Sequence, residues 1–145
     1  MTWSVENPGP LIAFSGSRKF TEQRVVEETM RRLVRRWPHC IIRVGDARRG
    51  LDPMAAKEAT RWGKWPDVQE CYWPPEPATK RMRWEAAHER NGRVIQDAAF
   101  LIAFYSPDER TSGTTDCIKQ ARERGIPVYI YQAGKWELPK AEAAA

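Results

Sequence analysis

The sequence predicts an α/β domain built on a doubly wound parallel sheet. Short, unbroken apolar segments alternate with amphipathic stretches of helical period along most of the 145 residues. Unbroken apolar strands are typical of a parallel sheet that is covered by helices on both faces. The length fits one domain, and a hydrophobic fraction of 41% is enough for a packed core. We therefore expect a single unit with about five strands.

The first half of the chain is expected to supply three strands and two helices. The strands are predicted at residues 11–14, 40–44 and 68–72. Thr21 is expected to cap the first helix, and Pro38 to end it, because proline cannot continue a helix. The apolar stripe of this helix is predicted to consist of Val26, Met30, Leu33 and Trp37.

The second helix is expected to begin at Asp52. An N-cap residue followed by proline is a common start signal, and Pro53 follows Asp52 directly. Gly63 is the expected end of the helix. Its packing face would be formed by Ala55, Ala56, Ala59 and Trp62.

Two further helices and two strands are predicted in the second half. A helix over residues 79–97 precedes the most apolar strand, at residues 99–105, and a helix over residues 114–124 precedes the last strand, at residues 127–131. This alternation predicts a Rossmann-like sheet with helices on both faces. The inner side of the long helix is expected to carry Trp84, Ala87, Val94 and Ile95.

Composition limits the classes of protein to which the chain can belong. Residues 1–136 are expected to form the domain and residues 137–145 a flexible tail. The chain has neither an apolar run of about 20 residues nor a secretory leader, so we expect a cytoplasmic protein without a membrane partner. The net charge of +5 favours anionic partners.

The few cysteine and histidine residues argue against a metal site or a disulfide framework. Three widely spaced cysteines, without a Cys-x-x-Cys pair, and two histidines predict no metal and no cofactor. Cys40 and Cys71 lie in apolar segments and are expected in the core. Most of the seven tryptophans, Trp73 included, are also expected in the core. The alternative for Trp73, which follows the third predicted strand, is that it stacks on a base.

Three glycine-containing turns follow predicted strands and precede helices. In a parallel sheet, ligands bind beyond the carboxyl ends of the strands. Glycine there lets a ligand approach the backbone, and free N–H groups at a helix start attract anions. Three such turns in one small domain predict a phosphate site. The residues concerned are Gly16, Ser17 and Arg18; Gly45, Asp46, Arg48 and Asp52; and Ser112, Gly113, Thr114 and Thr115.

The phosphate site is expected to be of an unusual type. The pattern Gly-x-x-x-x-Gly-Lys-Ser/Thr is absent, which argues against a P-loop ATPase, and Gly-x-Gly-x-x-Gly is absent after the first strand. Arg18 directly follows a turn glycine, where a guanidinium can bind phosphate through two bonds. Arg48 and Arg49 compete for one such role, and Asp52 can accept hydrogen bonds from ribose hydroxyls as well as cap its helix.

The order of these motifs resembles the SLOG superfamily. From about Leu11 to Tyr131, the chain is similar to a family of small SLOG proteins related to YspA; more distant members are the LOG phosphoribohydrolases and the DprA DNA-processing proteins. The resemblance implies a Rossmann-like fold and a nucleotide-like ligand. Because LOG enzymes commonly dimerise, it also implies that a second copy of the chain could complete the site. The motifs are Gly16-Ser17-Arg18, Gly45 to Asp52, Arg90-Asn91 and Ser112-Gly113-Thr114.

Resemblance to the LOG enzymes suggests a catalytic pair. In those enzymes, an arginine in a His-Glu-Arg-Lys run and a glutamate soon after Gly-Thr cleave a nucleoside monophosphate to base and ribose 5-phosphate. Arg90 matches the arginine, but Asn91 replaces the lysine. Cys117 occupies the position of the glutamate, and Asp116 precedes it. The resemblance thus names Arg90 and Asp116 as catalytic candidates. Asparagine is a mediocre helix former, so burial of Asn91 would indicate a polar contact that offsets its poor propensity.

Three functions follow as hypotheses. The first is a sensor or carrier domain that binds a nucleotide or another phosphorylated ribose compound, and we rank it above the others. The second is a nucleotide N-glycosidase that uses Arg90 and Asp116. The third, and the weakest, is a DNA- or RNA-binding protein, suggested by the net charge and by the similarity to DprA.

Overall fold

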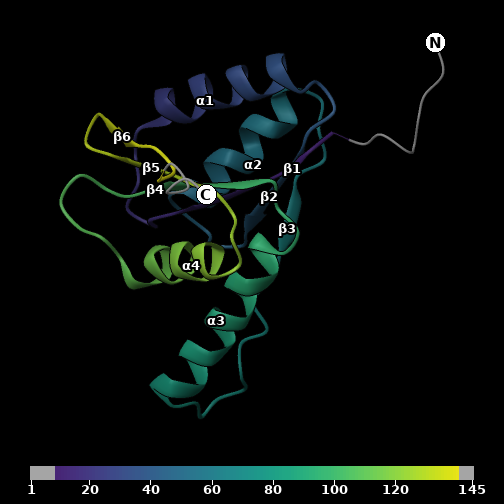
Figure 1. The fold of residues 1–145 in the computed structure, drawn as a ribbon. Helices are drawn as coiled ribbons and strands as arrows, with labels where there is room; N and C mark the ends of the chain where they lie inside the picture. Colours follow the sequence, from purple (N-terminus) through teal and green to yellow (C-terminus); the bar gives the residue numbers. More distant parts are fainter. Residues whose placement is uncertain (1–8, 141–145) are drawn as a thin grey trace.

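The computed structural model describes residues 9–140 as a six-stranded sheet with two helices on each face (Figure 1). Strands and helices alternate from β1 to β5, as the sequence predicts, and the α/β, doubly wound fold is confirmed. The strands are β1 (Leu11–Gly16), β2 (Ile41–Gly45), β3 (Asp67–Gln69), β4 (Phe100–Phe104), β5 (Val128–Gln132) and β6 (Lys135–Glu137). The helices are α1 (Gln23–Arg36), α2 (Leu51–Arg61), α3 (Lys80–Ile95) and α4 (Ser112–Glu123).

The strand order is β3-β2-β1-β4-β5-β6. Strands β1 to β5 are parallel, and β6 pairs antiparallel with β5. The order therefore reverses between β1 and β4, where the chain leaves one half of the sheet and enters the other. In sheets of this kind, the crevice beyond the strand ends at the reversal is the usual place for a ligand.

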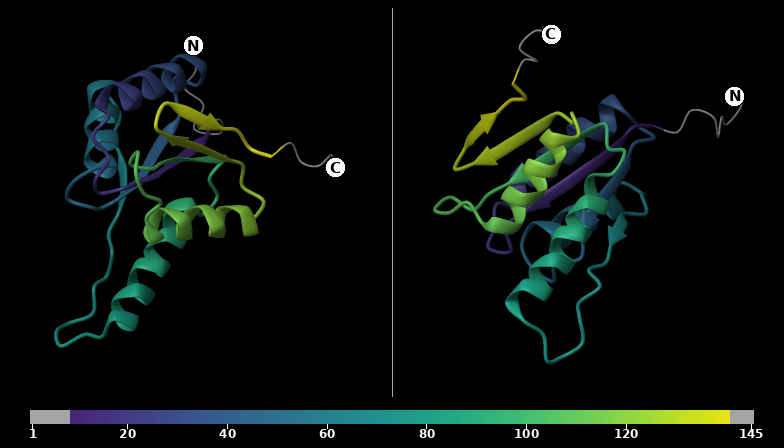
Figure 2. Two further views of the ribbon diagram at one scale, coloured as in Figure 1. Left: turned by 90° about the vertical axis from the view of Figure 1, so that its left-hand side faces the viewer. Right: turned by 60° about the horizontal axis from the view of Figure 1, so that its bottom comes forward.

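Each face of the sheet has its own core. On one face, α1 and α2 cover β1 and β2, and the buried side chains include Phe14, Met30 and Leu51. On the other face (Figure 2), α3 packs on β1, β2 and β3 and α4 packs on β1, β4 and β5, and the buried side chains include Ile95 and Cys117. Alternate residues of β1 point to opposite faces, which is why an unbroken apolar strand is required.

Two glycines allow the end of β1 to touch the start of α2. Gly50 has a φ of +82°, and a Cβ at this position would lie 2.3 Å from the carbonyl oxygen of Ser17. A Cβ on Gly16 would lie 2.4 Å from that of Leu51. The Leu51 amide donates to the Ser17 carbonyl oxygen at 3.1 Å. Only glycine fits at these positions, and the contact joins the first two turns.

Helix starts differ from the sequence predictions. Helix α2 begins at Leu51 with Gly50 as its N-cap, so Asp52 lies in the first turn and does not cap it. Helix α1 has Glu22 as its N-cap, and Thr21 lies outside the helix. The predicted start of α3 agrees with the structure to within one residue: Thr79 is the N-cap, and its hydroxyl accepts from the Met82 amide at 3.1 Å.

The expectation that most tryptophans lie in the core is wrong. Among the described residues, no tryptophan is fully buried; Trp3 lies outside them. Trp73 is 49% exposed and Trp84 43% exposed. The reason is that the first half of α3 and the loop before it project beyond the sheet (Figures 1 and 2), so Trp84 has no layer to pack into. By contrast, Cys40 and Cys71 are buried as predicted.

The sheet also continues beyond the last predicted strand. After β5, the chain turns through Ala133 and Gly134, both at positive φ, and returns as β6. Glu137, placed in the tail by the sequence, is the last residue of β6; most of the tail, residues 141–145, lies outside the described residues. No helix within residues 9–140 has the length and apolar character needed to cross a bilayer.

The Gly50 contact can be tested by substitution. We expect Gly50→Ala to lower the free energy of unfolding by roughly 3 kcal/mol or more, because it adds a clash with Ser17 to the cost of positive φ. Gly63→Ala is the matched control, since Gly63 also has positive φ (+76°) but an added Cβ meets no atom; it should cost only about 1 kcal/mol. Urea denaturation measures both values, and equal losses would contradict the contact.

Candidate functional site

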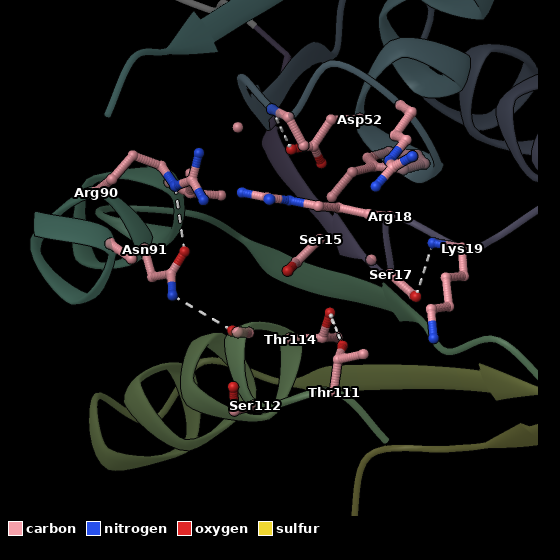
Figure 3. A pocket seen from close by; sticks show the side chains of 18 of the residues that line it. Ser15, Ser17, Arg18, Lys19, Asp52, Arg90, Asn91, Thr111, Ser112 and Thr114 are labelled. Carbon is pink, nitrogen blue, oxygen red and sulfur yellow. Dashed lines mark hydrogen bonds between the residues drawn. The ribbon is translucent and has the colours of Figure 1, made fainter. Parts of the chain in front are cut away.

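The three glycine-containing turns line one cavity of about 380 Å³ at the carboxyl ends of β1, β2 and β4 (Figure 3). The volume is within the range of small-molecule sites. The cavity lies where the strand order reverses, as expected for this fold. The predicted ligand-binding and catalytic residues that line it are Gly16, Ser17, Arg18, Gly45, Asp52, Arg90, Asn91, Ser112, Gly113 and Thr114.

The first turn contributes backbone groups and cations. The Ser17 amide donates to the carbonyl oxygen of Phe104 at 3.0 Å, which fixes the turn to the end of β4. The buried Ser17 hydroxyl accepts from the Lys19 amide at 3.0 Å. Lys19 forms an exposed ion pair with Glu109 at 3.1 Å. Arg18 is exposed and lines the cavity, so its guanidinium is available to a ligand.

The third turn places the start of α4 at the cavity. Thr111 is the N-cap, but its hydroxyl contacts the hydroxyl of Thr114 at 3.3 Å and does not cap the helix. The first N–H groups of a helix have no partner within it, and they carry the positive end of the dipole. A Cβ added to Gly113 would meet no atom within 4 Å. Protein packing therefore does not require glycine here, whereas it does at Gly16 and Gly50.

Asp52, in the second turn, is a buried carboxylate that lines the cavity. Its Oδ2 accepts from the Ala47 amide at 3.1 Å, and only 7% of the residue is exposed. Burial raises the pKa of Asp52 to about 6, although the Ala47 amide and the Arg90 guanidinium oppose this shift. Carboxyl groups with a raised pKa in a cleft are frequent at functional sites.

Gly45 makes room for two charged groups at the floor of the cavity. A Cβ on Gly45 would lie 2.9 Å both from Arg90 Nη1 and from Asp52 Oδ2. Arg90 Nη1 donates to Asp46 Oδ1 at 2.5 Å, and Asp46 Oδ2 accepts from the Cys71 amide at 3.0 Å. Asp46 therefore holds Arg90 in place; it does not itself line the cavity.

Asn91 connects this floor to α4. The residue is buried, and its Oδ1 accepts from Arg90 Nε at 3.2 Å. Its Nδ2 donates to Asp116 Oδ2 at 3.0 Å and to the Gly113 carbonyl oxygen at 3.3 Å. The prediction that a buried Asn91 would make a polar contact is confirmed. These bonds link α3 to the first turn of α4, beside the free N–H groups.

Asp116 lies behind the cavity wall. Its carboxylate accepts hydrogen bonds from Asn91 and from Gln120 Nε2, each at 3.0 Å, and is 2.8 Å from His88 Nδ1. Neither Asp116 nor Thr115 lines the cavity, and the Thr115 hydroxyl is 2.6 Å from that of Tyr105. Cys117, at the position of the LOG glutamate, is fully buried, and burial raises the pKa of its thiol to about 12.

Several lining residues were missed or misjudged by the sequence argument, and three of them bear directly on ligand binding. Trp73 and Trp84 both line the cavity, with about half of each side chain exposed. Trp73 follows β3 at the same edge of the sheet as the three turns, and this position is the reason that base stacking is the alternative to a place in the core. Arg49, and not Arg48, is the arginine of the second turn that lines the cavity.

The charge of the cavity is positive. Among the described residues that line it, the basic side chains are Arg18, Lys19, Arg49 and Arg90, and the acidic one is Asp52. Arg90 and Lys19 have carboxylate partners, whereas Arg18 and Arg49 form no ion pair within the described chain. Residues 9–140 contain no group of three His, Cys, Asp or Glu side chains placed to hold a metal ion. The cavity is suited to an anion.

Comparisons with known proteins extend the description of the fold. No family model and no curated protein matches the chain. DNA processing protein A (DprA) from Streptococcus pneumoniae has a similar structure, with a TM-score of 0.61 and 17% identity over 83% of this chain and 50% of DprA. Translation initiation factor eIF-2B from Pyrococcus horikoshii OT3 gives a TM-score of 0.55 and 15% identity over 85% of this chain and 39% of that protein.

These likenesses define the class of fold. The chain spans half or less of the length of the two proteins. At these identities the likenesses show the fold alone, and they support the Rossmann-like fold that the sequence predicts.

The raised pKa of Asp52 predicts a pH-dependent stability. Because the folded protein holds the Asp52 proton more tightly than the unfolded chain, stability is lost as the pH rises from about 4 to about 6. We expect Asp52→Asn to match the wild type near pH 4 and to exceed it by about 3 kcal/mol at pH 8. Denaturation with urea at both pH values measures this, and a difference that does not change with pH would refute it.

Proposed function

We propose that this chain binds a nucleotide or another phosphorylated ribose compound as a sensor or carrier domain. We further propose that it belongs to the YspA-related family of small SLOG proteins. The observation that carries the proposal is the convergence of three strand-to-helix turns on one cavity, with the uncapped start of α4 beside it. A helix start of this kind favours a phosphate group.

The phosphate is assigned to the start of α4 and the first turn. The free N–H groups of Ser112, Gly113 and Thr114 lie at the cavity, and the lack of a side chain at Gly113 leaves space above them. Arg18 and Arg49 form no ion pair within the described chain, so their positive charge is available to the phosphate. Arginine is well suited to phosphate because its guanidinium forms two parallel bonds.

The base is assigned to the rim of the cavity near α3. Trp73 and Trp84 line this part, and partly exposed tryptophans offer flat surfaces for stacking. The loop before α3 and the first half of α3 project beyond the sheet, so no layer of the domain covers these two side chains. Binding of a base would bury part of both side chains.

The N-glycosidase hypothesis has less support. It requires Asp116 to act on the ligand, but the Asp116 carboxylate is engaged by three side chains and lies behind the wall. Arg90 lines the cavity, yet it is neutralised by Asp46. We therefore propose binding without turnover, and chromatography of AMP after incubation with the protein would reveal free adenine if turnover occurs.

Thermal denaturation with a ligand panel tests binding. We expect AMP, ADP-ribose or NAD to stabilise the protein by about 2.7 kcal/mol when the ligand is present at 100 times its Kd, and adenosine to have little effect because it lacks phosphate. Gly113→Ala should raise the stability of the free protein by about 0.5–1 kcal/mol, as alanine favours a helix. It should also weaken stabilisation by AMP, because the added methyl group occupies the phosphate position.

A pair of arginine variants provides the control for charge. Arg18→Ala should weaken AMP binding roughly tenfold, whereas Arg35→Ala, an exposed position near the end of α1 and outside the cavity lining, should leave it unchanged. If none of the phosphorylated ligands stabilises the protein, or if adenosine acts as strongly as AMP, the proposed function is wrong.

A further inference from the structure

Asp52 has one carboxylate oxygen without a protein partner. Oδ2 is bound by the Ala47 amide at 3.1 Å. Within residues 9–140, Oδ1 accepts no hydrogen bond from the protein, although the residue is more than nine-tenths buried and lines the cavity. An ionised carboxylate can accept about four hydrogen bonds, so most of its capacity is unused. Burying such a group without donors is costly, and a ligand that supplies them would offset that cost.

The position of Asp52 relative to the start of α4 limits the ligand. Figure 3 shows Asp52 on the opposite side of the cavity from Thr111, Ser112 and Thr114, with Ser15 and Arg18 between them. A molecule that places a phosphate on α4 must therefore extend across the cavity to reach Asp52. A hydrogen-bond donor is needed at that far end.

We propose that Asp52 binds the 2′- and 3′-hydroxyl groups of the ligand's ribose, and that the site therefore selects ribose phosphates over 2-deoxyribose phosphates. This inference rests on the proposed function, because it assumes that a phosphate occupies the start of α4. The two hydroxyl groups are adjacent donors, and they lie at the end of the sugar opposite its 5′-phosphate. They match a carboxylate that faces a phosphate site across a small cavity.

The charges around Asp52 favour a neutral donor over a cation. Arg90 and Arg18 both act on the Asp52 carboxyl with their positive charge. Arg90 Nη1 and Asp52 Oδ2 both lie beside Gly45: a Cβ added to Gly45 would be 2.9 Å from each of them. With Asp46 included, two guanidinium groups offset two carboxylates around this point, so an amine or a metal ion would meet no net negative charge there. A hydroxyl group donates without adding positive charge.

Ligands without a base test the inference most directly. Isothermal titration of the wild-type protein with ribose 5-phosphate and 2-deoxyribose 5-phosphate, and with AMP and 2′-deoxyAMP, compares ligands that differ in one hydroxyl group. We expect the deoxy compound of each pair to bind roughly ten- to hundredfold more weakly, the usual effect of losing a hydrogen bond to a charged group. The sugar phosphates have no base, so a preference for ribose 5-phosphate cannot come from a hydrogen bond between Asp52 and an amino group of the base.

Asp52→Asn assigns the selectivity to this side chain. The variant keeps an oxygen that can accept from the Ala47 amide but loses the negative charge. We expect it to bind AMP and 2′-deoxyAMP with affinities that agree within about threefold, through weaker binding of AMP. Asp67→Asn is the matched control, because Asp67 is paired with Arg43 at 2.8 Å and does not line the cavity; it should retain the wild-type preference.

The outcomes distinguish this inference from the function on which it rests. Equal binding of ribose and deoxyribose ligands by the wild type would overturn the role of Asp52 and leave the phosphate site intact. An unchanged preference in Asp52→Asn would overturn it as well. Failure of all four compounds to bind would overturn the proposed function together with this inference. The wild-type comparison needs no variant, so it holds even if Asp52→Asn folds poorly.

Discussion

The backbone of Gly50 lies against the backbone of Ser17 and Arg18, nearer than any residue with a Cβ could approach. This contact, with the hydrogen bond from the Leu51 amide to Ser17, fixes the turn after β1 relative to the start of α2. The Ser17 amide in turn binds the end of β4. These contacts hold turns that are far apart in the sequence at one edge of the sheet. The cavity is formed by the three turns together.

A second set of bonds determines the charge and shape of the cavity floor. Arg90 is held between Asp46 and Asn91, and Asn91 continues the connection to Asp116 in α4. The residues that resemble a catalytic pair are thus two members of a bonded series that joins α3 to its neighbours. The positions of Arg90 and Asp116 in the LOG-like pattern are explained by these hydrogen bonds as well as by a catalytic role. The groups left unpaired at the cavity, Arg18, Arg49 and Asp52, are the ones that a ligand can use.

Local patterns predicted the fold and the three turns, because apolar runs and turn glycines are properties of short segments. Contacts between distant segments could not be predicted in this way. The sequence predicts Asp52 as a helix cap, but Gly50 is the N-cap in the structure. The sequence names Asp116 as a catalytic candidate, but His88 and Gln120 contact its carboxylate in the structure. The choice between Arg48 and Arg49 depends on the course of an irregular loop. Trp73 and Trp84 were assigned to the core because the projection of α3 has no signature in composition.

The central claim is that Arg18 of the first turn and the free amides at the start of α4 in the third turn form one anion site. A titration of the ¹⁵N-labelled protein with AMP, followed by amide chemical shifts, tests this most directly. The account predicts the largest shifts at Arg18, Gly113 and Thr114, with smaller shifts at Asp52 and none at the carboxyl end of α1. Shifts that are confined to another surface, or that appear at only one of the two turns, would contradict it.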